Sequence, residues 1–156
     1  MIRLSRILLP TDFSVYSGEA TKYACAFAEK FDAELHLLHV LETRPSSTPE
    51  FAGGLALPTS VKENREACEH ALLKVLDSAW GQSRRGKIVR FIADGTPFVE
   101  IVRYARELSI DLVVLGTHGR SGLAHVLMGS VAERVVRKSP CPVLTVRPEG
   151  HQFVMP

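Results

Sequence analysis

The chain has 156 residues and a formal net charge of +2 at pH 7, with 46% hydrophobic and 23% charged residues. These values are ordinary for a globular protein, so we expect a single folded domain over residues 1–156. So small a positive charge argues against nucleic-acid binding, and the short apolar runs argue against a membrane span.

The first half of the chain predicts two strands and two helices. An apolar run predicts a strand over Arg3–Leu9, and apolar residues at helical spacing predict a helix over Val15–Phe31. Leu35–Val40 is typical of a second strand. Ser60–Glu63 matches a capping box, and one apolar stripe from Cys68 to Ala79 predicts the helix behind it.

The second half continues the same alternation. We expect strands at Ile88–Ala93, Leu112–Leu115 and Val143–Val146. A helix over Pro97–Leu108 follows the first of them, since proline is well tolerated at the first helical position. A last helix is expected over Gly129–Lys138 and ends before a proline.

This alternation predicts an α/β fold, in which right-handed crossovers build one five-stranded parallel sheet with helices on both faces. One connection breaks the pattern, because Glu42–Thr59 is rich in proline and glycine and has no helical stripe. A loop of this length is either a functional lid or a floppy surface loop, and the residues leave both interpretations open.

The richest chemistry follows the first and fourth strands. Open parallel sheets bind ligands beyond the carboxyl ends of their strands. Pro10–Ser14 follows the first strand, while Gly116–Gly122 and then Gly129–Ser130 follow the fourth. Glycines let backbone amides approach a ligand, the start of the last helix favours an anion, and Arg120 can add a charged fork. The pattern predicts phosphate binding, against the alternative of tight turns with a capping serine.

Other signatures are absent from the sequence. It has no GxxxxGK[ST] and no GxGxxG, so neither a P-loop nor a dinucleotide site is expected. His118 and His125 have no carboxylate or HxxxH partner nearby, and we expect no metal site. Cys25 and Cys68 lie on apolar helix stripes and are expected to pack as small hydrophobic residues. An odd cysteine count and no secretory signal predict a cytoplasmic protein.

Taken together, these residues resemble the universal stress protein family. Gly116, Gly119, Gly129 and Ser130 match its G-x2-G-x9-G-[ST] motif, and the opening Ile7–Ser14 is similar to its first strand and loop. The resemblance covers essentially the whole chain. It implies a strand order of 3-2-1-4-5, membership of the ATP-binding branch, and a homodimer.

The resemblance also implies a role for each ligand-binding residue. Asp12 would face the ribose or adenine, Val40 would hold the adenine edge through its backbone, and the glycine-rich residues would cradle the phosphates. Asp12 could instead form an Asx turn or helix cap, and Val40 could be a core valine. The predicted cofactor is ATP, with or without Mg²⁺, and the predicted binding residues are Pro10, Thr11, Asp12, Val40, Gly116, Gly119, Arg120, Gly129, Ser130 and Val131.

The leading hypothesis is an ATP-binding stress or signalling module without fast enzymatic turnover, because no residues are clearly placed to orient an attacking water. One alternative is a slow Mg²⁺-dependent ATPase, or a self-phosphorylating protein that uses Ser121 or Ser130. Another is a dimerisation module that binds no nucleotide. We expect a homodimer through Cys141–Val146, whose edge would otherwise stay open, and a signalling partner that the sequence does not name.

Overall fold

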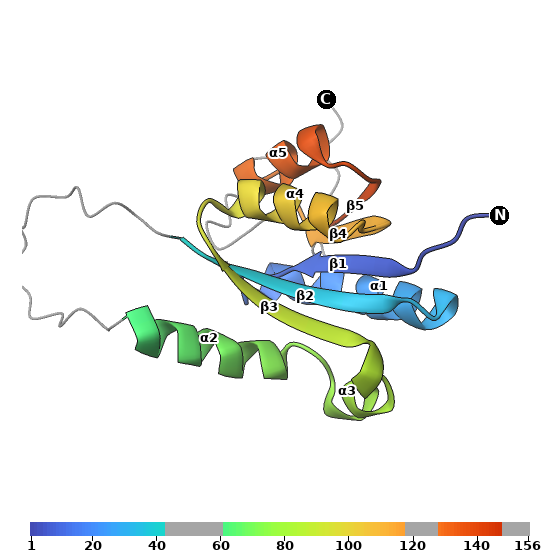
Figure 1. The fold of residues 1–156 in the computed structure, drawn as a ribbon, viewed down its shortest axis with the longest axis horizontal. Coiled ribbons are helices and arrows are strands. Elements are labelled where there is room, and N and C mark those ends of the chain that lie inside the picture. Colours follow the sequence, from blue (N-terminus) through green and yellow to red (C-terminus); the bar gives the residue numbers. More distant parts are fainter. Residues whose placement is uncertain (43–60, 118–127, 148–156) are drawn as a thin grey trace, which may run out of the picture.

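The structure, a computed structural model, describes residues 1–42, 61–117 and 128–147. Within them, one parallel sheet has the strand order β3-β2-β1-β4-β5 (Figure 1). Its strands are β1 (Arg6–Pro10), β2 (Glu34–Leu41), β3 (Ile88–Asp94), β4 (Leu112–Gly116) and β5 (Val143–Val146). The predicted α/β class and the order 3-2-1-4-5 are confirmed.

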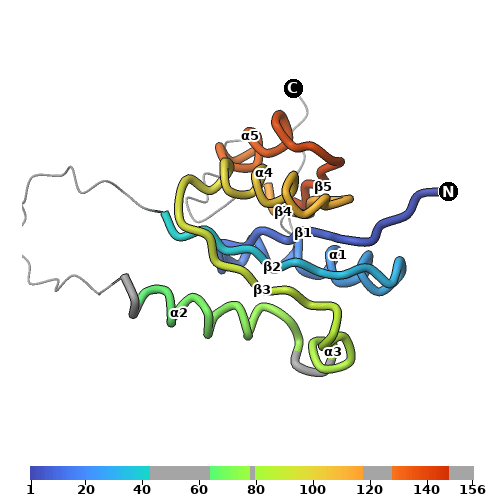
Figure 2. The backbone as a smooth tube through the Cα atoms, in the orientation of Figure 1, coloured from blue at the N-terminus to red at the C-terminus, as the bar shows by residue number. Residues whose placement is uncertain are grey.

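Helices cover both faces of this sheet. They are α1 (Val15–Phe31), α2 (Val61–Lys74), the short α3 (Ser78–Ser83), the 3₁₀ turn η1 (Arg85–Lys87), α4 (Pro97–Glu107) and α5 (Ser130–Lys138). Helices α1 and α2 lie on one face, and α4 and α5 lie on the other, as the tube in Figure 2 also shows. None of the helices in the described residues is long and apolar enough to cross a membrane.

Alternate residues of β1 supply the two halves of the core. Ile7 and Leu9 pack with the small alanines of α1, whereas Leu8 packs with Tyr104 and Ala105 of α4. All three β1 side chains are fully buried. Because helices cover both faces, the central strands are apolar along their whole length rather than at every second residue.

The hydrogen-bond ladder continues past the carboxyl ends of three strands. The Thr11 amide donates to the carbonyl of Leu38, and the Thr117 amide donates to that of Val146, each at 2.9 Å. Gly95 bonds the carbonyl of Leu41 in the same way. The loops that leave β1, β3 and β4 are therefore tied to the neighbouring strand at their first residue.

The first strand is shorter than expected. The sequence predicts its start at Arg3, but pairing begins at Arg6, opposite Glu34 of β2. The neighbouring strand β2 begins at Glu34, so the ladder ends at the Ser5 carbonyl, which accepts the Glu34 amide at 2.8 Å. The Asp111 carboxylate accepts the amides of Ser5 and Arg6 instead, at 2.6 and 2.9 Å.

The predicted continuous stripe from Cys68 to Ala79 is divided between two helices. Helix α2 ends at Lys74, and α3 begins at Ser78. The Asp77 carboxylate accepts the Trp80 amide at 3.2 Å, which is the geometry of a helix cap. Asp77 therefore caps a new helix at a point where the apolar spacing alone predicts that one helix continues. The Glu42–Thr59 loop beyond residue 42, and Ser60 of the predicted capping box, lie outside the described residues.

Candidate functional site

A cavity of about 560 Å³ opens at the carboxyl ends of β1, β2 and β4, beside the start of α5. Eight of the ten predicted ligand-binding residues line it: Pro10, Thr11, Asp12, Val40, Gly116, Gly129, Ser130 and Val131. The other two, Gly119 and Arg120, lie outside the described residues. The fold therefore brings together residues that are separated by more than a hundred positions in the sequence.

Two walls of the cavity have different origins. The β1/β2 wall consists of Pro10, Thr11, Asp12, His39 and Val40. The β4/α5 wall consists of Gly116, Thr117, Gly129, Ser130 and Val131. Strands β1 and β4 are neighbours in the sheet, so the two walls meet at its centre.

Side-chain hydrogen bonds shape the loop of the β1/β2 wall. The Asp12 Oδ1 atom accepts the Ser14 amide at 3.0 Å, and the Thr11 Oγ1 atom accepts the Phe13 amide at 3.1 Å. Ser14 then caps α1 by accepting the Ser17 amide. Asp12 thus forms the Asx turn that was the alternative to a ligand role, and it lines the cavity at the same time.

Val40 is both a core valine and a residue of the cavity wall. Its side chain is half-buried and packs against the core cluster on the α4 side. Its backbone pairs with Ala93 of β3, and the residue lines the cavity near the end of β2. The structure therefore places a core valine where its main chain can also border a ligand.

Backbone groups shape the β4/α5 wall. The Gly129 amide donates to the Thr117 carbonyl at 2.6 Å, so this amide is already engaged. Helix α5 starts at the next residue, and its first-turn amides, including those of Ser130 and Val131, have no partner within the helix. Gly129 has φ −65° and ψ 155°, which any residue adopts. Backbone strain therefore does not account for a glycine at this position.

Several cavity residues were not predicted. Thr117 is 3% exposed. Its amide donates to the Val146 carbonyl of β5, and its carbonyl accepts the Gly129 amide just before α5. Its position directly after the apolar run of β4 was the signal in the sequence. Asn64 and Cys68 reach the cavity from α2, and their spacing of four residues places them on one helix face. Only the packing of α2 beside β2 and β3 reveals that this face reaches the site.

Both histidines of β2, His36 and His39, are buried. His36 contacts Tyr104 and Glu34, with Nδ1 at 2.9 Å from the tyrosine oxygen and Nε2 at 2.7 Å from the carboxylate. Burial lowers the pKa of His36 below its usual value, although Glu34 acts in the opposite direction. His39 lies on the other face, where it lines the cavity.

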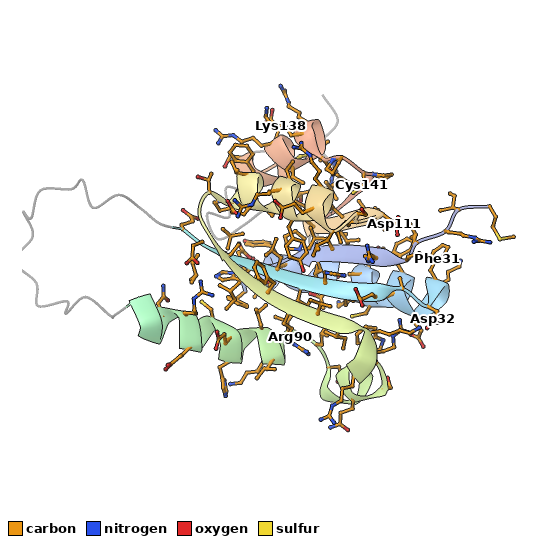
Figure 3. All side chains as sticks on the ribbon, viewed as in Figure 1. Phe31, Asp32, Arg90, Asp111, Lys138 and Cys141 are labelled. Carbon is orange, nitrogen blue, oxygen red and sulfur yellow. The ribbon has the colours of Figure 1, made fainter. Side chains whose placement is uncertain are left out.

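The cysteines pack as small apolar groups. Cys25 and Cys68 lie against the core on the α1 side, and burial raises the pKa of Cys25 to about 11. Cys141 lies beside Asp111 at the end of the sheet where the strands begin, away from the cavity (Figure 3). Within residues 1–42, 61–117 and 128–147, no three His, Cys, Asp or Glu side chains are arranged to hold a metal ion.

Sequence comparison identifies relatives along nearly the whole chain. The model of the universal stress protein family matches residues 4–147. Universal stress protein MJ0531 of Methanocaldococcus jannaschii is 39% identical over 144 residues, which cover 91% of this chain and 81% of that protein. MJ0577 of the same organism is 31% identical, with 94% and 96% covered.

Solved structures give the same result. A structure of MJ0577 superposes with a TM-score of 0.73 at 30% identity, covering 96% of this chain and 99% of that chain. A universal stress protein in complex with cAMP has a TM-score of 0.64 at 23% identity, with 94% and 98% covered. The Archaeoglobus fulgidus universal stress protein in complex with dAMP has a TM-score of 0.61 at 19% identity, with 93% and 98% covered.

Proposed function

This chain belongs to the universal stress protein family, and from that premise we propose that it is an ATP-binding module whose nucleotide occupancy changes its dimer or partner surface. One observation carries the proposal: residues from the ends of three strands and the start of one helix line a single cavity of about 560 Å³. That volume is within the usual range for small-molecule sites. The cAMP and dAMP complexes of proteins with the same fold support an adenine nucleotide as the ligand.

The β1/β2 wall is the proposed site of the base and ribose. Val40 lines the cavity and its side chain is half-buried, and we propose that its main chain meets the edge of the adenine ring. Asp12 accepts the Ser14 amide through Oδ1, and a carboxylate can accept several hydrogen bonds at once, which suits a ribose hydroxyl. Pro10 and Thr11 complete this wall.

The β4/α5 wall is the proposed site of the phosphates. Amides of Ser130 and Val131 lie in the first turn of α5, where the helix dipole favours negative charge. The Ser130 hydroxyl adds a donor beside them. Gly116 and Gly129 carry no side chain into this wall, so phosphate oxygens can approach the main chain. Gly119 and Arg120 are proposed to act on the same phosphates, as the family motif implies.

We further propose a homodimer through the open edge of β5. Pro142 and Val146 accept hydrogen bonds from Val113 of β4 and from Thr117, which follows β4. The alternate residues Val143 and Thr145 therefore direct their backbone groups outward. Among the described residues, β5 pairs only with β4. An unpaired edge of this kind is a ready site for a second strand.

The opposite edge of the sheet carries a charged side chain at its carboxyl end. On β3, the outward carbonyl of Ile92 accepts a hydrogen bond from Arg65 of α2 at 3.4 Å. Arg65 also pairs with Asp94 at the end of the strand. A charged side chain across an edge strand discourages pairing with another chain. This contrast favours β5 over β3 as the dimer edge.

The cytoplasm is the proposed location. Cys25, Cys68 and Cys141 are all within the described residues and form no disulfide with one another. Chains of reducing compartments keep their cysteines in this state.

The decisive experiment is to denature the purified protein and identify released nucleotide by chromatography. Calorimetric titration of nucleotide-free protein with ATP, AMP, cAMP and GTP follows. We expect release of an adenine nucleotide and tighter binding of ATP than of GTP. Absence of both release and binding would support the dimerisation module instead. Sustained phosphate release with Mg²⁺ would identify an ATPase, and incorporation of labelled phosphate would identify self-phosphorylation.

A further inference from the structure

We propose that His39 is a positioning residue, which fixes the loop of Thr11 to Ser14 and thereby sets the affinity of the cavity for an adenine nucleotide. The inference rests on the proposed function for its ligand. It assigns to a buried strand residue a role that its sequence position does not suggest.

The main contact joins the end of β2 to the end of β1. His39 Nδ1 lies 2.8 Å from the carbonyl oxygen of Thr11. A carbonyl can only accept, so Nδ1 carries the hydrogen and the tautomer of the neutral ring is fixed. His39 and Thr11 are each 6% exposed, so the contact between them is buried. A buried carbonyl that loses its donor is costly, and the loop would shift to recover one.

A second contact reaches the loop on the far side of Asp12. The His39 ring lies 4.3 Å from the Phe13 ring, measured between centroids. Phe13 has φ 62°, a left-handed conformation that is unfavourable for a bulky residue. Such a conformation persists only when its surroundings hold it. Here the Thr11 hydroxyl oxygen binds the Phe13 amide, and the His39 ring packs on the side chain.

His39 therefore holds the residues on both sides of Asp12. The Asp12 carboxylate is oriented by the Ser14 amide within the same turn. If the contacts of His39 are removed, the turn can relax and Asp12 loses its fixed position at the cavity. A ligand would then have to order the loop on binding, which lowers its affinity.

His36 provides a matched control on the same strand. It is buried at 4% exposure, close to the value for His39, and it makes two hydrogen bonds of its own. Its partners are Tyr104 and Glu34, on the face that α4 covers. It does not line the cavity. Loss of His36 should thus remove a buried hydrogen-bonded histidine without affecting the loop.

The experiment compares His39→Leu, His39→Asn and His36→Leu with the parent protein, using calorimetry with ATP and urea unfolding. We expect His39→Leu to weaken ATP binding about tenfold, the effect of one buried hydrogen bond and its neighbouring contact. His39→Asn retains an N–H donor on its δ atom and should recover most of that loss. His36→Leu should unfold more easily but bind ATP within about twofold of the parent, since a structural cost alone leaves the folded site intact.

The outcomes separate this inference from the proposed function. A parent protein that binds no adenine nucleotide overturns the proposed function. A parent that binds ATP, with His39→Leu binding equally well, overturns the role of His39 and leaves the proposed function standing. The same holds if His36→Leu weakens ATP binding as much as His39→Leu.

Nitrogen-15 NMR of the parent protein tests the contact if the variants do not fold. We expect a hydrogen on Nδ1 of His39 and slow exchange of the Phe13 amide. A neutral His39 ring with its hydrogen on Nε2 and a bare Nδ1 would overturn the proposal, with or without nucleotide binding.

Discussion

The two walls of the cavity are built in opposite ways. In the β1/β2 wall, side chains hold the main chain: Thr11, Asp12 and His39 each bond a backbone group of the same loop. In the β4/α5 wall, backbone groups bond one another: the Gly129 amide donates to the Thr117 carbonyl, and the first turn of α5 follows directly.

This difference predicts how each wall responds to mutation. In a wall built from backbone groups, a substitution has little effect on ligand affinity unless the new side chain fills the space of the ligand. Such a side chain should abolish binding. In a wall held by side-chain hydrogen bonds, each substitution should lower the ligand affinity by a limited amount, because each bond contributes a limited free energy. Substitutions in the two walls should therefore weaken nucleotide binding to different extents.

Gly129→Val should have the largest effect, with ATP affinity falling by more than about 100-fold. The backbone angles at Gly129 suit valine, so the fold should persist while the branched side chain occupies the space of the phosphates. Calorimetry measures binding and urea unfolding measures stability. Gly18→Val is the matched control, since a Cβ at Gly18 meets no atom within 4 Å and Gly18 does not line the cavity. Tight ATP binding by the Gly129 variant would place the phosphates elsewhere.

Substitutions of Asp12 should produce a graded loss on the other wall. Asp12→Ala removes both the Asx-turn acceptor and the charge, and should weaken ATP binding about tenfold. Asp12→Asn keeps the acceptor for the Ser14 amide and should cost about threefold. Calorimetry at one salt concentration measures both. Equal losses in the two variants would mean that the turn contributes nothing beyond the charge.

His36 should affect stability and leave both walls unchanged. Burial lowers its pKa in the folded protein, so below its ordinary value of 6.5 the unfolded chain binds more protons than the folded one. Stability should then decrease as the pH falls from 6.5 toward the folded pKa, by at most about 1.4 kcal/mol per pH unit. Urea unfolding between pH 5 and 7.5 measures the slope. Nearby Glu34 is present in both proteins, so a slope unchanged in His36→Leu would exclude His36 as its origin.

Thr145→Pro should have the smallest effect on the cavity, because no residue of β5 lines it. Its amide is directed to the open edge, where proline is compatible with a strand. We expect the dimer to dissociate at concentrations where the parent remains dimeric, and ATP affinity to stay within about twofold. Sedimentation measures the first and calorimetry the second, with Thr145→Val as the control. A parent that sediments as a monomer at tens of micromolar would contradict the dimer.

The sequence predicted the two walls unequally. The glycine spacing from Gly116 to Ser130 is visible along the chain, because backbone-based sites require small residues at set intervals. The start of α1 was predicted in the same way, from local apolar spacing. No local pattern links His39 to Thr11, because the two residues are 28 positions apart in the chain. The division between α2 and α3 was missed because a single cap at Asp77 outweighed the apolar stripe.

By itself, the sequence determined the order of strands and helices, which follows from local hydrophobic period and capping. Only the tertiary structure decided which face of β2 each histidine occupies and where Arg65 of α2 contacts the β3 edge of the sheet. Those features depend on contacts between residues far apart in the chain. Local propensity does not predict these contacts, because they stabilise the protein only once the sheet has formed and both partners are buried.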